Sequence, residues 1–285
     1  MKQQIFFKSA LLLTAAILSF TAFAKKDKAE KAGWQLGVQS YTFHKFNFCQ
    51  AVDKTQQLGL KNMEVYYGQP LGGDMEGTMD YKMDKATQEK VLNYAKSKGV
   101  KIKASGVIIC SNEAEWEQLF QFADAMGIEI ITCEPEYKHL KYVDELANKY
   151  KIDVAIHNHP KPSNYWNPDL FLKAVDGLSN RIGACADVGH WARMGLDPVE
   201  CLKKIDGRVK SLHFKDIKAK EEGEAEQHDV IWGTGILDIK GMLNELKAQN
   251  FKGLFSIEYE YAWENSVPDI EKNISYFKTV TNEVL

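Results

Sequence analysis

The most regular feature of the chain is an alternation of short apolar runs with longer amphipathic stretches. Runs of five to eight residues that carry few charges are typical of strands buried in a parallel sheet. Eight such runs follow one another, and we predict a strand in each: Gln35–Tyr41, Asn62–Tyr67, Ile102–Ile109, Glu129–Glu134, Asp153–His157, Ile182–Asp187, Val209–Phe214 and Leu254–Glu258.

The stretches between these runs have the marks of helices. Glu113–Met126 carries acids in its first turn and ends at Gly127, as a capped helix does. Further helices are predicted at Asp144–Tyr150, Asp169–Leu178, Pro198–Ile205, Ile239–Gln249 and Pro268–Thr279. This α/β alternation over about 250 residues predicts a (β/α)₈ TIM barrel. An open doubly wound sheet usually has a glycine-rich phosphate turn after its first strand, and Ser40–His44 contains none.

The first residues predict an export signal. Lys2 and Lys8 precede an apolar segment, Leu11–Phe20, and Ala22-Phe23-Ala24 is a small-x-small cleavage site. The alternative is a transmembrane anchor, but the apolar segment is too short to span a bilayer comfortably. We therefore predict a cleaved signal peptide over residues 1–24, a flexible leader over 25–33, a single domain over 34–285, and export to the periplasm.

Composition narrows the functional classes. The 285 residues are 45% hydrophobic and 26% charged, which is ordinary for one large globular domain. The net charge of −3 gives no electrostatic reason to expect a nucleic-acid partner, and we expect no membrane contact after signal cleavage. A homo-oligomer is compatible with the sequence. The cysteines number five, which is odd, and they are not spaced like the cysteines of a disulfide framework. We therefore expect neither a disulfide nor a cysteine zinc site.

Five consecutive predicted strands end in acids or imidazoles. The residues in question are Glu134; His157 and His159; Asp187 with His190; His213 with Lys215; and Glu258 with Glu260. In a barrel the carboxyl ends of the strands form the active-site face. Burying such groups without partners would cost several kcal/mol each, roughly, and one shared cation removes that cost.

Four of these residues, Glu134, Asp187, His213 and Glu258, form an oxygen-rich ligand set. Such a set suits one divalent metal, Mn²⁺ or Mg²⁺, with Co²⁺ or Zn²⁺ as alternatives. Each residue also has a simpler interpretation. A lone glutamate after a strand can be an ion-pair partner of a lysine, and a lone histidine is more often a satisfied core residue than a ligand. The order of the whole set favours a shared metal.

At these motifs the chain resembles the xylose isomerase-like barrel superfamily, often described as sugar phosphate isomerases/epimerases. The matching segments are Cys133-Glu134-Pro135, His157-Asn158-His159, Asp187-Val188-Gly189-His190, His213-Phe214-Lys215-Asp216, Gly233-Thr234-Gly235 and Ser256-Ile257-Glu258. The resemblance implies that the four residues named above bind one divalent metal. It also implies that His190 and Lys215 face the substrate.

Departures from the family's motifs narrow the range of expected substrates. Endonuclease IV takes extra histidine ligands from its second and third strands, and none stands at the corresponding ends here, which makes DNA repair a poor fit. Ketose 3-epimerases carry an arginine shortly after the histidine that ends their seventh strand, which corresponds to His213 here. In this chain Phe214–Trp232 contains no arginine. The His-Asn-His-Pro form resembles branches that act on 3-keto sugars and glycosides.

We therefore expect a metal-dependent sugar isomerase or epimerase that removes a proton α to a carbonyl through a metal-stabilised enediolate. Glu134 and Glu258 are the candidate bases, and if a group is eliminated, Lys215, His190 or His157 is the candidate acid that protonates the leaving oxygen. His157, Trp232 and Tyr66 are further candidates for substrate binding. One alternative is a 3-keto-glycoside lyase or hydratase that works by β-elimination at the same site. Another is a non-catalytic periplasmic carbohydrate-binding protein, which would have a broken ligand set.

Overall fold

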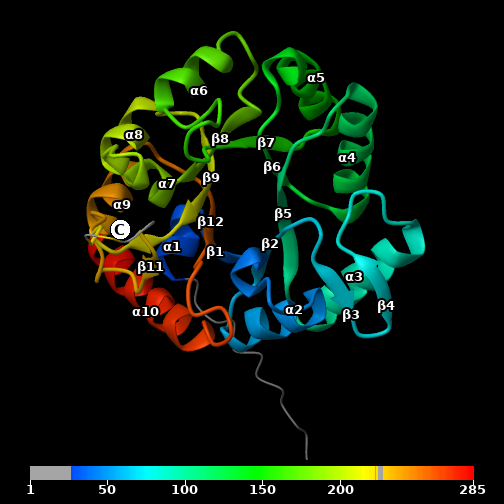
Figure 1. Ribbon diagram of the computed structural model, residues 1–285, viewed down its shortest axis with the longest axis horizontal. Coiled ribbons are helices and arrows are strands. Elements are labelled where there is room, and N and C mark those ends of the chain that lie inside the picture. Colours follow the sequence, from blue (N-terminus) through cyan, green and yellow to red (C-terminus); the bar gives the residue numbers. More distant parts are fainter. Residues whose placement is uncertain (1–26, 222, 224–226) are drawn as a thin grey trace, which may run out of the picture.

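The computed structural model describes residues 27–221, 223 and 227–285, and its centre is a closed barrel of eight parallel strands. Around the barrel the strands follow the order β1-β12-β9-β8-β7-β6-β5-β2 (Figure 1). Their bounds are β1 Trp34–Gln39, β2 Asn62–Val65, β5 Lys101–Ile108, β6 Ile130–Cys133, β7 Asp153–His157, β8 Ile182–Asp187, β9 Val209–Phe214 and β12 Gly253–Ile257. Each coincides with a predicted strand, so the (β/α)₈ barrel is confirmed.

Helices form a ring outside the strands (Figure 1). They are α2 Phe48–Gln57, α3 Lys85–Ser97, α4 Glu113–Met126, α5 Leu140–Tyr150, α6 Pro168–Ala174, α7 Val188–Arg193, α8 Pro198–Lys204, α9 Ile239–Ala248 and α10 Val267–Val284. Two long loops contain short antiparallel ribbons, β3 Pro70–Gly72 with β4 Met75–Thr78, and β10 Asp216–Ile217 with β11 Asp229–Val230. Short 3₁₀ turns, η1 Ser40–Phe43 and η2 Tyr137–His139, follow β1 and β6. The sequence did not predict these ribbons and turns.

The segment before the barrel differs from the predicted flexible leader. Residues Lys28–Ala32 form helix α1, with Asp27 as its N-cap and Gly33 in the left-handed conformation at its end. Ala29 is buried, and the Lys28 ammonium donates to the carbonyl of Asn282 in α10 at 2.7 Å. These contacts hold residues 28–33 against the rest of the domain. The predicted signal peptide lies outside the described residues, and among those residues no helix is long and apolar enough to cross a membrane.

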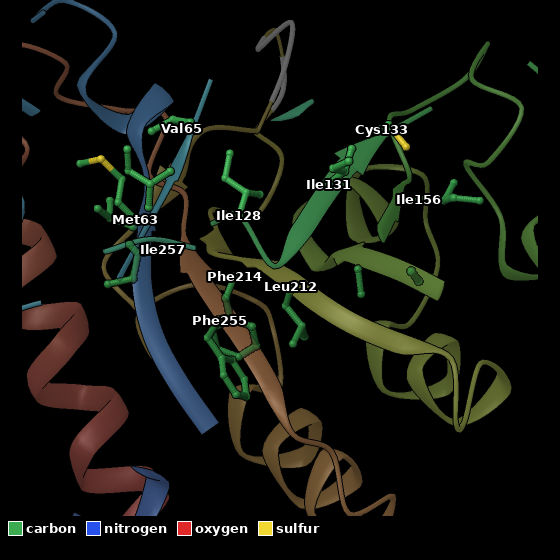
Figure 2. Packing of buried hydrophobic residues seen from close by; sticks show 14 of the residues in the cluster. Met63, Val65, Ile128, Ile131, Cys133, Ile156, Leu212, Phe214, Phe255 and Ile257 are labelled. Atoms are coloured by element: carbon green, nitrogen blue, oxygen red, sulfur yellow. The ribbon is translucent and has the colours of Figure 1, made fainter. Parts of the chain in front are cut away.

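Side chains alternate across each strand, and this alternation divides the core in two. Met63, Val65, Leu212, Phe214, Phe255 and Ile257 belong to the large cluster that joins strands and helices (Figure 2). There the rings of Phe214 and Phe255 meet edge to face, with centroids 5.4 Å apart. A separate small cluster comes from the other face of five strands: Ala104, Ile130, Ala155, Cys185 and Leu254. In these five strands an apolar side chain therefore lies on the inward face, below the carboxyl end of the strand.

Candidate active site

The inward columns become polar toward the carboxyl ends of the strands. In β8 the column runs from Cys185 to Asp187, and in β12 from Leu254 through Ser256 to Glu258. The period of two that puts the small apolar cluster inside the barrel also puts these polar groups there. The candidate site is thus the upper layer of the barrel interior, and it lies on the face that the sequence predicted.

Asp187 is the best-anchored acid of the site. It ends β8 and caps α7, because its Oδ1 accepts the backbone N–H of His190 at 2.7 Å. Asn158 holds its backbone in place through hydrogen bonds of 2.8 and 2.9 Å. Its Oδ2 lies 3.0 Å from the Lys215 ammonium and 3.5 Å from Nε2 of His157. Burial alone would raise the pKa of Asp187, but His190, Lys215 and His157 hold it well below its usual range.

Lys215 is a fully buried cation among three carboxylates. Its ammonium lies 2.7 Å from Glu258 Oε2, 3.0 Å from Asp187 Oδ2 and 3.0 Å from Glu260 Oε1. Burial would lower the pKa of Lys215, but these acids raise it well above its usual value. A Cβ at Gly189 would come within 2.5 Å of Lys215 Cδ, so the glycine of the Asp-Val-Gly-His motif makes room for the lysine stem.

His213 is held between two acids. Its Nδ1 lies 3.1 Å from Glu258 Oε2, and its Nε2 lies 3.1 Å from Glu64 Oε1. Burial would lower the pKa of His213, but Cys185, Glu258 and Glu64 raise it well above its ordinary value. The sequence analysis missed Glu64, which stands inside the short strand β2 rather than at its end. Its charge within an apolar run is the signal that could have identified it.

Glu134 reaches the other ligands through a histidine. Its Oε1 lies 3.1 Å from His157 Nδ1 and accepts the backbone N–H of His159, and its Oε2 accepts the Ser163 hydroxyl at 2.8 Å. Burial would raise the pKa of Glu134, but the two imidazoles keep it far below its usual range. His157 therefore lies between Glu134 and Asp187, more deeply than its predicted role in substrate binding implied.

His190 is a largely buried imidazole beside the acids. Its Nε2 lies 3.5 Å from Asp187 Oδ2, and its Nδ1 lies 3.3 Å from a guanidinium nitrogen of Arg193. Burial lowers the pKa of His190 to about 3, against the attraction of Asp187 and with further lowering by Lys215 and His157. The imidazole is thus neutral at ordinary pH.

The residues fit a divalent cation. Asp187 Oδ2 and His213 Nδ1 are buried and have no hydrogen-bond partner in the described part of the chain, although charged groups lie near both. Ligand atoms of His157, Asp187 and His213 lie within 4.8 Å of one another. Glu64, Glu134, Asp187, Glu258 and Glu260 add five acids to this region, and the ammonium of Lys215 balances one of them. Oxygen and imidazole donors with excess negative charge suit Mg²⁺, Mn²⁺ or Zn²⁺.

A cavity of about 390 Å³ opens above this cluster. One side is lined by His157, His159, His190, Glu258 and Glu260, and the other by Gln39, Tyr41, Tyr66, Tyr67, Gly106 and Val107. Asp187, His213 and Lys215 are fully buried and do not line it. The cavity therefore has a charged side and an aromatic side.

The two aromatic side chains predicted to bind the substrate lie in different surroundings. Tyr66 lines the cavity, where a sugar ring can reach it. Trp232 does not: it is buried against Phe214 and Phe277, with ring centroids 5.0 and 6.2 Å away. The Trp232 ring is therefore part of the core, and the expectation that it stacks on a sugar does not fit this position. Its loop turns inward because Asp216 accepts the backbone N–H groups of Gly233 and Gly235, both at 2.9 Å.

A closed parallel barrel with acids and imidazoles at the carboxyl ends of its strands defines the chain as a (β/α)₈ barrel with an enzyme-like site. The chain belongs to the xylose isomerase-like TIM-barrel family, whose model matches residues 52–280. The resemblance inferred from the motifs is thereby confirmed.

Relatives and solved structures extend this assignment. The chain is 30% identical over 187 residues to an inosose dehydratase of Clostridium perfringens, covering 60% of this chain and 57% of the relative. It is 27% identical over 135 residues to an inosose dehydratase of Lactiplantibacillus plantarum, covering 43% and 45%. It thus spans about half the length of these relatives. A crystal structure of an uncharacterised Parabacteroides distasonis protein is 37% identical, with a TM-score of 0.71 over 87% of this chain and 99% of that one.

Two more distant structures of the same fold contain divalent metals. A zinc-bound IolI protein is 16% identical with a TM-score of 0.69, covering 88% of this chain and 99% of that one. A Mycobacterium smegmatis barrel in complex with magnesium is 11% identical with a TM-score of 0.72, covering 92% and 100%. At such identities the likeness establishes the fold alone. The metals are properties of those proteins.

Proposed function

We propose that this protein is a divalent-metal-dependent enzyme that removes a proton α to the carbonyl of a keto sugar and then eliminates a group from the β carbon. The observation that carries the proposal is the buried cluster of Asp187, His213, His157 and Glu258, with two ligand atoms that lack hydrogen bonds, below a cavity lined by acids and imidazoles. The similarity to dehydratases supports elimination, because a dehydratase removes water.

Asp187, His213, Glu258 and Glu134 are the residues that would hold the metal, with His157 beside them. A divalent ion bound there would act as a Lewis acid on the carbonyl and a neighbouring hydroxyl of the substrate. Glu134 fits less directly than the sequence suggested, because His157, His159 and Ser163 already contact its oxygens. A ligand role for Glu134 requires its side chain to turn away from them.

Glu258 is the better-placed base. Its carboxylate lines the cavity, and its pKa is held far below the usual range, against burial, by His213 and Lys215. It takes the α proton, and the electron pair of the broken C–H bond forms the new C=C bond as the C–O bond to the leaving group breaks. The Lys215 ammonium, 2.7 Å from Glu258, would then give a proton to the departing oxygen. This step requires the lysine side chain to reach past Glu258, because Lys215 does not itself line the cavity. Water or an alcohol leaves, and no oxidant is needed.

Isomerisation or epimerisation, which the sequence ranked first, is the second candidate. It is favoured by the positions of Glu134 and Glu258, which follow β6 and β12. These strands lie four places apart in both directions around the barrel, so two bases would face the substrate from opposite sides. Against it, Glu134 does not line the cavity.

Incubating the purified chain in D₂O with Mn²⁺ or Mg²⁺ and a panel of keto sugars distinguishes these reactions. The panel holds free ketoses, an inosose, and 3-keto-glucosides with methyl and aryl leaving groups, and products are read by NMR. Released water or alcohol with an unsaturated ketone supports elimination. Deuterium incorporation into an epimer or isomer without release favours the second candidate. If there is neither turnover nor deuterium exchange, both candidate reactions are contradicted. A carbohydrate-binding protein then remains.

We further propose export to the periplasm with cleavage after Ala24, as the N-terminal pattern predicts. Breakdown of glycosides outside the cytoplasm would suit the elimination. N-terminal sequencing of the protein from a periplasmic fraction should begin at Lys25. A mature protein that retains Met1 in the cytoplasm would contradict the export.

A further inference from the structure

Glu64 is a buried carboxylate with no part in the mechanism above. It lies in the middle of β2, on the inward face, and is fully shielded from solvent. It does not line the cavity. A buried acid is costly unless it is paired, so its partners indicate what it does.

Those partners lie on strands far away in the sequence. Oε1 of Glu64 is 3.1 Å from Nε2 of His213 in β9, and Oε2 accepts the Ser256 hydroxyl in β12 at 2.6 Å. Going around the barrel from β2, β12 is the second strand and β9 the third. Glu64 therefore reaches across the barrel interior and meets His213 from the side opposite to Glu258.

This geometry determines how His213 can act. An ionised carboxylate only accepts hydrogen bonds, so the His213 nitrogen facing Glu64 must carry the proton. The other nitrogen, Nδ1, lies 3.1 Å from Glu258 Oε2 and has no hydrogen-bond partner in the described part of the chain. A cation held by Nδ1 and Glu258 would replace any proton that Nδ1 carries in its absence. Histidines that bind metals commonly donate their second ring N–H to a carboxylate, which fixes the tautomer and raises ligand basicity.

We infer that Glu64 is a positioning residue that keeps the His213 proton on Nε2 and so presents Nδ1 to a divalent cation. The inference rests on the proposed function in so far as that function places a metal beside His213. It adds a residue from β2, a strand whose end contributes no charge to the site.

Zinc is a suitable probe because it is diamagnetic. In the full chain, labelled with ¹⁵N-histidine and loaded with Zn²⁺, long-range ¹H–¹⁵N spectra should show the His213 proton on Nε2 and a metal-bound Nδ1. This measurement needs no variant, so it holds even where a substitution at Glu64 prevents folding. A proton on Nδ1 overturns the inference.

The variant test measures zinc affinity by competition with a fluorescent chelator. Glu64→Gln keeps the shape but removes the charge, and its amide can donate to Nε2 and move the proton to Nδ1. We expect zinc affinity to fall about 10–100-fold, with the Nε2 proton signal lost. Ser256→Ala is the matched control, because it removes the other partner of Glu64 but leaves the carboxylate on His213. It should weaken zinc binding by about threefold or less.

The outcomes separate two failures. Unchanged zinc affinity in Glu64→Gln overturns this inference but not the proposed function. An equal loss of affinity in Ser256→Ala does the same, because it would mean that any change in the interior layer disturbs the site. A wild-type protein that binds no Zn²⁺ overturns the proposed function and this inference together.

Discussion

The two halves of the barrel mouth are built from different chemistry. The strands β6, β7, β8, β9 and β12 end in carboxylates, imidazoles and an ammonium within a few ångströms of one another. The strands β1, β2 and β5 lead instead into Gln39, Tyr41, Tyr66, Tyr67 and the Gly106-Val107 peptide. The cavity lies between the halves, so a substrate would meet a charged wall on one side and an aromatic wall on the other.

The difference follows from what each group needs when buried. The charged residues neutralise one another, so they must be adjacent; five neighbouring strands supply all of them except Glu64, which comes from β2. The aromatic rings need only packing: Tyr41 meets Tyr66 and Trp263 edge to face at 5.2 and 6.0 Å, and stacks on His44 at 4.9 Å. We propose that the charged half carries the reaction and the aromatic half recognises the ring faces of the substrate. Substitutions in each half test this division.

Asp187→Asn should have the largest effect, because it removes the acid at the centre of the charged half. We expect loss of the bound divalent metal and a fall in activity of about a thousandfold or more, since metal assistance contributes several kcal/mol. Metal analysis of the purified variant, beside turnover of the best substrate, measures both. Glu260→Gln is the control, because Glu260 also contacts Lys215 but is not a predicted ligand. Retention of a full equivalent of metal in Asp187→Asn would remove Asp187 from the ligand set.

Lys215→Met tests whether Lys215, in the charged half, donates a proton without being needed for metal binding. We expect activity to fall about a hundredfold, the usual size of a lost proton donor, while the metal stays bound because a cation has been removed from beside Asp187 and Glu258. Rates and metal content are measured on the same preparation. If metal and activity disappear together, Lys215 organises the ligands and does not serve as the acid.

The pH dependence of stability tests the buried state of His190. The pKa of folded His190, about 3, lies below the ordinary imidazole value of 6.5, so its contribution to stability is fully present above pH 6.5 and is lost as the pH falls toward 3. In chelator-treated protein, His190→Gln should therefore lose about 2 kcal/mol less unfolding free energy than the wild type between pH 7 and pH 4.5. Urea unfolding at the two pH values measures this, and parallel curves for the two proteins would mean that His190 is already charged.

Tyr41→Ala should have the smallest effect and belongs to the aromatic half. Tyr41 lines the cavity and remains partly exposed, so its loss removes a ring face but no charge. We expect KM for an aryl glycoside to rise about fivefold with little change in kcat, because a ring contact contributes about 1 kcal/mol. Tyr41→Phe should behave as wild type. A large fall in kcat in Tyr41→Ala would show that the two halves do not divide binding from chemistry.

The sequence revealed the charged half well and the rest of the site poorly, for a physical reason. Asp187 and Glu258 stand at strand ends, and strand ends in a parallel barrel converge whatever the details of packing. Glu64 stands within a strand, and its partners His213 and Ser256 are 149 and 192 residues away, so only closure of the barrel brings them together. Glu260 stood among the polar strand ends, but only the folded barrel shows that it contacts Lys215.

By itself the sequence determined the strands, their order with the helices and the end of the barrel that carries the chemistry, because periods of two and 3.6 and the positions of charges are local properties of the chain. The tertiary structure alone decided which charges pair. It joined Glu134 to the ligands through His157, buried Lys215 among three acids, moved Trp232 into the core and ordered residues 28–32 as a helix. Each of these depends on distances between residues remote in the chain, which packing sets and no local pattern records.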